Sequence, residues 1–288
     1  MKPVDVALAL LVTLVWGVAF VLTKVALETI SPPLLMAVRF LVAALPVLFV
    51  ARPGLPWPLL VGLGLTLFVG QFLFQFIGIA QGVPPGLASV IVQSQALFTV
   101  GFAAALLGQV PTQRQIGALV IATAGLVCIA GTIGEEFDAR ALLLILVSPV
   151  SFALGNVLLK RAGETDMFGL IAWLSLVPPL PGLALAAAID GPASIWRSAV
   201  ETPALGWIAA GYLGLVATTF GYAAWGRLIR RYSAATIAPF ALLVPFVGAA
   251  ASSLVFGEAF GPLRLTGMAL VLAGLALLLM PATSRRPA

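Results

Sequence analysis

The 288-residue chain is 61% hydrophobic and only 9% charged, whereas about a quarter of the residues in ordinary soluble domains carry a charge. This number of charged residues is too small to cover a water-exposed surface. The composition therefore excludes an ordinary soluble protein and indicates a membrane protein. The formal net charge is +5. The basic residues, however, occur one to three at a time between apolar segments and form no patch that would bind nucleic acid.

The chain has no histidine and a single cysteine, Cys128, so we expect no intrachain disulfide and no transition-metal site. It also lacks a phosphate-binding glycine-rich loop with lysine, a Ser/His/Asp set and paired carboxylates within the apolar segments. We therefore expect neither an enzyme nor an ATP-driven pump, and no cofactor.

Ten apolar segments follow one another along the chain, each close to the roughly 20 residues that cross a bilayer core. They are residues 4–25, 33–50, 58–80, 86–107, 113–131, 140–159, 168–189, 204–226, 234–256 and 263–281. The first segment is long enough to span and lacks a small-residue cleavage site, so we expect it to be retained as a helix. The longest connection, about 190–203, is too short for a further domain.

The distribution of lysine and arginine between alternate loops predicts the orientation, because cytoplasmic loops are enriched in both. With the N-terminus inside, ten basic residues fall on the cytoplasmic side and four on the opposite side. The ten are Lys2, Arg52, Arg114, Lys160, Arg161, Arg227, Arg230, Arg231, Arg285 and Arg286; the four are Lys24, Arg140, Arg197 and Arg264. We expect a multi-pass protein of the bacterial inner membrane with both termini in the cytoplasm.

The second half of the chain resembles the first at an offset of 149 residues. Gly108-Gln109 aligns with Gly257-Glu258, and Phe76 aligns with Trp225. Residues 1–138 and 139–288 then form two repeats of five segments each, and an odd number forces the second repeat to be inverted in the membrane. The expected fold is all-α and integral to the membrane, with ten transmembrane helices in two inverted five-helix repeats, as in many secondary transporters. The alternative is a duplicated membrane protein that does not transport.

Several short motifs carry a family resemblance. They are Trp16-Gly17-Val18-Ala19-Phe20 with Lys24, Gly108-Gln109 followed by Gly117 and Gly125, and Pro245 followed by Phe256-Gly257-Glu258. Their order over the whole chain resembles the EamA repeats of the drug/metabolite transporter superfamily. The first repeat departs from that pattern, with Gln109 where glutamate is usual and Ala96 at the counterpart of Pro245. The resemblance implies ten spans, cytoplasmic termini and export of metabolites, and the amino-acid exporters, including those for aromatic amino acids, look most similar.

Polar side chains in spanning helices normally face the bundle interior or a water-filled cavity. The candidate substrate-binding residues are these and the large aromatic residues near them: Trp16, Phe20, Arg39, Gln71, Gln75, Phe76, Gln93, Ser94, Phe98, Asn156, Tyr222 and Trp225. Amides bind both carboxylate and ammonium groups, and aromatic rings add apolar and cation–π contact. For each residue, helix–helix packing is the alternative. Arg39 is expected to bind either helix carbonyls or a substrate carboxylate.

These features predict a monomeric exporter of amino acids with aromatic or other apolar side chains, embedded in the lipid bilayer and working by alternating access. The acidic residues lie near segment ends and histidine is absent, so the simplest expectation is a facilitator without proton coupling. One alternative is a different solute in the same fold. A nucleotide sugar would need several cations in the cavity, where we expect only Arg39. A cationic drug would need a carboxylate at mid-membrane, where the sequence has none. The other alternative is a membrane assembly partner that does not transport.

The predicted orientation is testable with a reporter that is active only in the periplasm. Fused after Ala288, it should stay inactive in intact cells, because the charge distribution places that end in the cytoplasm. A fusion in the loop around residue 136 should be active and serves as the control. High activity after Ala288 would contradict the predicted number of spans or their direction.

Overall fold

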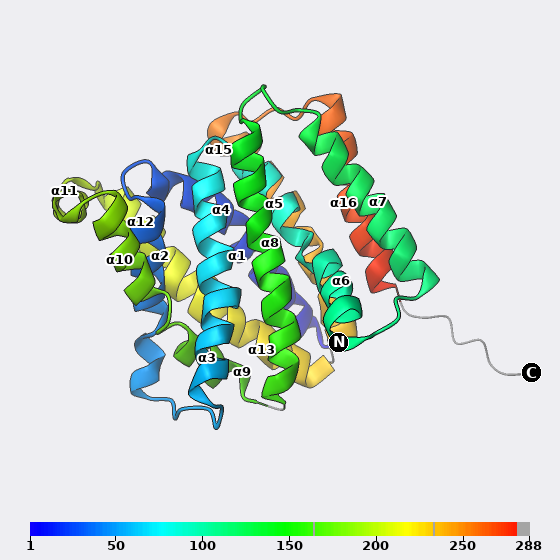
Figure 1. Ribbon diagram of the computed structural model, residues 1–288, viewed down its shortest axis with the longest axis horizontal. Helices are drawn as coiled ribbons and strands as arrows, with labels where there is room; N and C mark the ends of the chain where they lie inside the picture. Colours follow the sequence, from blue (N-terminus) through cyan, green and yellow to red (C-terminus); the bar gives the residue numbers. More distant parts are fainter. Residues whose placement is uncertain (164, 233, 281–288) are drawn as a thin grey trace, which may run out of the picture.

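The computed structural model describes residues 1–163, 165–232 and 234–280, and every regular element in these ranges is helical (Figure 1). Arg285 and Arg286 of the charge count, and the last residue of the tenth segment, lie outside them. The first half contains α1 (Pro3–Leu27), α2 (Pro32–Ala43), η1 (Leu45–Leu48), α3 (Trp57–Gly64), η2 (Leu65–Gly70), α4 (Gln71–Ala80), α5 (Pro85–Gln93), α6 (Gln95–Leu107) and α7 (Gln113–Ala130). The second half contains α8 (Ala139–Leu159), η3 (Lys160–Ala162), α9 (Met167–Leu174), α10 (Pro179–Ile189), α11 (Pro192–Glu201), α12 (Ala204–Gly211), η4 (Tyr212–Phe220), α13 (Gly221–Tyr232), α14 (Ala234–Ala241), α15 (Leu243–Phe256) and α16 (Pro262–Leu279).

Within the described residues, nine helical stretches are long and apolar enough to cross a membrane. They correspond to nine of the ten predicted segments. The remaining one, the second along the chain, is the shorter apolar helix Pro32–Leu48, and its last turn is the 3-10 turn η1, which contains Pro46. The connection at 190–203 contains α11, a helix that the sequence analysis did not predict. It begins with Pro192 and ends before the Thr202-Pro203 pair. Proline is favoured at the first position of a helix, and the residue before a proline disfavours helical backbone, so both ends follow from the sequence.

Most of the spanning stretches are interrupted. Turns η2 and η4 are π-helical and lie at corresponding places in the two halves, and such turns are frequent at functional sites. The fourth span breaks at Ser94 and the ninth at Leu242. The ninth contains Pro245, which has no backbone N–H to donate to the carbonyl of Ala241, four residues earlier. The seventh span breaks between Leu174 and Pro179.

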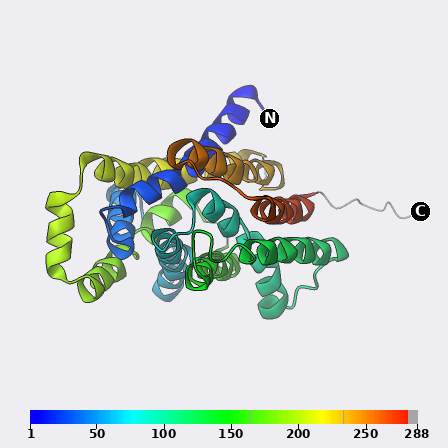
Figure 2. The same ribbon diagram turned by 90° about the horizontal axis from the view of Figure 1, so that it is seen from above.

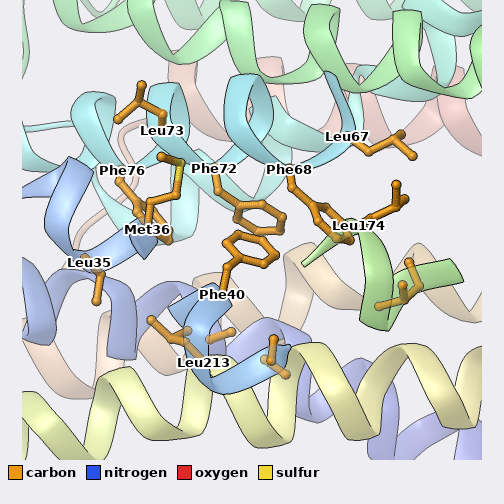
Figure 3. Close-up of a cluster of buried hydrophobic side chains, with 14 of the residues drawn as sticks. Leu35, Met36, Phe40, Leu67, Phe68, Phe72, Leu73, Phe76, Leu174 and Leu213 are labelled. Carbon is orange, nitrogen blue, oxygen red and sulfur yellow. The ribbon is translucent and has the colours of Figure 1, made fainter. Parts of the chain in front are cut away.

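The helices form an elongated bundle, with α7 and α16 paired at one edge and α11 at the opposite edge (Figures 1 and 2). Helix α1 lies within the bundle and packs on α5, α12, α13 and α15. An aromatic cluster joins α2 to η2 and α4, with the Phe40 ring centroid 4.7 Å from that of Phe68 and 5.3 Å from that of Phe72 (Figure 3). This contact fixes the position of α2, the helix that carries Arg39.

Glycines bring the backbones of α7 and α16 into direct contact. A Cβ atom added at Gly125 would lie 2.6 Å from the carbonyl oxygen of Gly267, and one at Gly274 would lie 2.7 Å from that of Ala118. Small residues allow such close approach of helices in a membrane, where packing replaces the hydrophobic effect as the driving force. The α7–α16 pair therefore depends on the absence of side chains at these positions.

Changing Gly125 to alanine should destabilise the protein by about 1–3 kcal/mol, because the new methyl group overlaps backbone atoms that cannot move aside easily. The matched control is Gly117→Ala on the same helix, where the nearest atom, in Leu277, is at an ordinary contact distance of 3.7 Å. Thermal unfolding of the purified protein in detergent compares the two. Equal melting temperatures for the two variants would contradict the close α7–α16 contact.

Candidate functional site

A cavity of about 340 Å³ lies among the spanning helices, with contributions from both halves of the chain. Its lining includes the last residues of α5, the last turns of α8 and the first residues of α9. The α5 residues lie near the middle of the span Pro85–Leu107, whereas the α8 and α9 residues lie at the end of the bundle that carries the loop after Lys160. The cavity therefore extends from the middle of the bundle toward that end.

Nine of the twelve candidate residues line this cavity. They are Trp16, Phe20, Arg39, Gln71, Gln75, Gln93, Asn156, Tyr222 and Trp225. These residues come from α1, α2, α4, α5, α8 and α13. The fold brings together side chains that are up to about two hundred residues apart in sequence.

The other three candidates do not line the cavity. Phe76 is fully buried behind it, with its ring centroid 6.0 Å from that of Phe72. Ser94 is buried at the break between α5 and α6, where its hydroxyl donates to the carbonyl oxygen of Ile91, as serine does at helix ends. Phe98 lies one turn further along α6, outside the lining.

The lining also contains residues that were not among the candidates. Thr23, Phe68, Phe72, Gln95 and Phe152 are examples. Thr23 lies seven residues after Trp16, on the same face of α1, so helical spacing could have identified it. Gln95 and the aromatic residues are, like the chosen candidates, polar or large aromatic residues within apolar segments, so the same criterion could have selected them. The aliphatic lining residues, in contrast, resemble lipid-facing ones and carry no signal in the sequence.

Among the described residues that line the cavity, Arg39 is the one ionic side chain. It is buried, its Nε donates to Thr218 Oγ1 at 3.1 Å, and its guanidinium carbon lies 3.9 Å from the ring centroid of Phe72. No salt bridge within the described ranges involves Arg39. The threonine and the ring hold the guanidinium in place without neutralising its charge, so it can bind an anion.

Five amide side chains line the cavity, and four of them differ in their hydrogen bonds. Gln93 Nε2 donates to the carbonyl oxygen of Ala241 at 2.9 Å, the carbonyl that Pro245 leaves without its helical donor. Asn156 Nδ2 donates to Thr99 Oγ1 at 3.2 Å.

The Oε1 atoms of Gln71 and Gln95, by contrast, are buried and accept no hydrogen bond. A buried acceptor without a hydrogen bond destabilises a folded protein by about 1–3 kcal/mol. These two oxygens are thus the ones that a bound donor group would satisfy.

Three aromatic side chains form one wall of the cavity. The Trp16 ring centroid lies 5.6 Å from that of Tyr222 and 5.1 Å from that of Trp225. The Trp16 indole nitrogen donates to the carbonyl oxygen of Ala217 at 2.9 Å, and Ala217 belongs to the π-helical turn η4. The turn therefore anchors the wall, whose ring faces offer apolar and cation–π contact.

At the other end of the bundle, Glu258 joins the α15–α16 loop to the first turn of α5. Its carboxylate accepts hydrogen bonds from the backbone N–H groups of Gly86 at 3.1 Å and Leu87 at 3.3 Å, and from the hydroxyl of Ser252. A carboxylate at a helix N-terminus is favoured by the helix dipole. This contact links the two halves of the chain at that end of the bundle.

Burial raises the pKa of Glu258 above its ordinary value of 4.5, and the nearby charge of Glu136 acts in the same direction. The hydrogen bonds from Ser252, Gly86 and Leu87 oppose this change and do not cancel it. A carboxyl group with a raised pKa binds protons more readily, so acidification favours an arrangement in which Glu258 is buried over one in which it is exposed to water.

The chain is similar to known transporters over most of its length. The model of the EamA-like transporter family matches residues 5–131 and 139–280. A probable amino-acid metabolite efflux pump of Salmonella typhimurium is 37% identical over 278 residues, which cover 94% of this chain and 93% of the pump. An uncharacterized inner membrane transporter of Escherichia coli K12 is 28% identical, over 81% of this chain and 77% of that protein.

A crystal structure with only 18% sequence identity shares the fold, with a TM-score of 0.62 over 96% of this chain and 97% of the other. The helices and the family match agree on a protein that crosses the membrane several times. The chain belongs to the EamA-like transporter family.

Proposed function

We propose that this protein exports amino acids with apolar side chains, aromatic ones included, across the inner membrane by alternating access. The observation that carries the proposal is the composition of the cavity wall. A single unpaired arginine, Arg39, lies among amide oxygens without partners and the faces of large aromatic rings. The family match, and the names of its amino-acid-exporting relatives, agree with this chemistry.

A zwitterionic amino acid complements this wall. Its carboxylate pairs with the Arg39 guanidinium, where charge-assisted hydrogen bonds are strong because water is scarce. Its ammonium group donates to Gln71 Oε1 and Gln95 Oε1 and lies near the indole and phenol rings. Its side chain contacts the remaining aromatic surface, which explains a preference for apolar substrates.

Alternating access requires a cavity that is open to one side of the membrane at a time. The cavity extends toward the end that carries Lys160 and Arg161, the cytoplasmic side by the charge distribution. The Glu258 contact with α5 closes the opposite end. The arrangement then represents an inward-facing state, and export requires this contact to open while the inner end closes.

Matching irregularities in the two halves support the proposed inverted repeats of residues 1–138 and 139–288. Helices α6 and α15 both end at a glycine with positive φ, Gly108 at 63° and Gly257 at 66°. These glycines are 149 residues apart, the offset found in the sequence. Two similar halves can form inward-facing and outward-facing states of similar energy within one monomer.

The role of Arg39 can be tested by efflux from proteoliposomes loaded with labelled phenylalanine. Arg39→Gln should reduce efflux by about 10-fold or more, since a hydrogen bond to a charged group contributes about 1.5–3 kcal/mol. Lys24→Gln is the control, because Lys24 is a cation near the end of α1 that lies over the Phe256 ring and not on the cavity wall.

Phenylalanine methyl ester, which has no carboxylate, separates recognition from general damage. Its protein-dependent efflux, measured as the excess over protein-free liposomes, should be slow for the unmodified protein and similar for Arg39→Gln. If Arg39→Gln carries phenylalanine at the unmodified rate, the assignment of the carboxylate site is wrong. Normal transport by both Trp16→Ala and Trp225→Ala would likewise contradict the aromatic wall.

The facilitator mechanism predicts no accumulation of substrate in proteoliposomes that hold equal phenylalanine on both sides and are given a pH gradient. Within the described part of the cavity lining, no acidic side chain is present to carry a proton. Accumulation that an uncoupler abolishes would contradict the mechanism. Repeating the measurement with Glu258→Gln would then show whether the proton moves through this half-buried carboxylate.

A further inference from the structure

A second concave site lies outside the transport cavity, on the membrane-facing surface where α3, α9 and α10 meet. It has a volume of about 460 Å³, and every residue that lines it is apolar. The proline-rich break between α9 and α10 keeps the two helices from continuing in one line, which leaves the surface concave beside α3. Leu65, Leu176 and Leu180 in its lining are exposed, and in a membrane such side chains face lipid.

One end of this groove is built from two tryptophans and carries a cation. The Trp57 and Trp173 ring centroids are 6.3 Å apart in an edge-to-face arrangement, and the Trp173 indole nitrogen donates to the carbonyl oxygen of Val50 at 3.1 Å. The Arg52 guanidinium carbon lies 4.6 Å from the Trp57 ring centroid. Tryptophan with arginine is the arrangement typical of the membrane–water interface.

Arg52 is exposed and takes part in none of the salt bridges found in the described ranges. Its charge is therefore available to an anion at the interface. From Trp57 to Leu65, along α3 to the first residue of η2, the groove runs about 12 Å at 1.5 Å per residue. That length approaches the depth of one leaflet, about half of a 30 Å hydrocarbon core.

We propose that this groove binds one anionic phospholipid of the leaflet at the Arg52 end, which the charge distribution makes the cytoplasmic leaflet. The phosphate group pairs with the Arg52 guanidinium, which the Trp57 ring holds in place. One acyl chain lies in the groove between Val61, Leu65, Leu176 and Leu180. A water-soluble anion would not occupy the apolar groove, and a neutral lipid would leave Arg52 without a partner.

The proposal is tested by native mass spectrometry of the full-length protein purified in detergent and mixed with phosphatidylglycerol or phosphatidylcholine of identical acyl chains. The unmodified protein should retain one phosphatidylglycerol molecule in preference to phosphatidylcholine. Arg52→Gln should weaken retention of phosphatidylglycerol about 5-fold, because one cation near an anionic group contributes about 1 kcal/mol. Arg197→Gln, an exposed arginine on α11, is the matched control.

Filling the groove tests the acyl-chain site independently of charge. Ala184→Phe places a ring in the groove and should lower retention of both lipids, whereas Ala188→Phe, exposed one turn further along α10, should not. Equal retention of the two lipids by the unmodified protein would overturn the proposal, even if a variant failed to fold. A dimer that Ala184→Phe dissociates, with lipid retention unchanged, would overturn it too, since the groove would then hold a second copy of the chain.

Discussion

The hydrocarbon core of a bilayer offers no hydrogen bonds, so every backbone polar group that leaves the regular helical pattern needs a partner inside the protein. Two of the irregular turns lie beside the cavity, and side chains of the cavity wall are their partners. Pro245 frees the carbonyl of Ala241, which accepts from Gln93. The carbonyl of Ala217, in a π-helical turn, accepts from Trp16. The breaks in the helices thus position the wall of the site.

Two buried arginines of this fold differ in whether an opposite charge compensates their own. Arg264 is 1% exposed and pairs with Glu135 at 2.9 Å and Glu136 at 2.8 Å, at one end of the bundle. Arg39 is 4% exposed, yet its described partners are a threonine hydroxyl and aromatic rings. A buried charge without an opposite charge is costly. The uncompensated charge of Arg39 on the cavity wall is therefore the observation on which the proposed carboxylate site rests.

Helix α9 lies between the transport cavity and the lipid groove. Met167 and Ile171 line the cavity, whereas Trp173 and Leu176 line the groove. The helix is short and ends before a proline-rich break, so it is connected to the rest of its span by a bend and not by a continuous helix. The proposed substrate site and the proposed lipid site thus share one short helix of the bundle.

The membrane class, nine of the spanning stretches to within a few residues, and nine of the residues that line the cavity could be predicted from the sequence. Long apolar stretches and isolated polar residues within them are local signals, and burial of polar groups away from lipid is a general rule. It did not predict helix α11 or the short length of the second span. Tertiary contacts determine which polar groups of the cavity wall lack a hydrogen-bond partner. Gln93 is bound by a carbonyl 148 residues away and Ser94 by its own helix, whereas Gln71 and Gln95 keep unpartnered oxygens. That difference depends on which backbone atoms distant segments bring within hydrogen-bond distance, and no local pattern in the sequence records it.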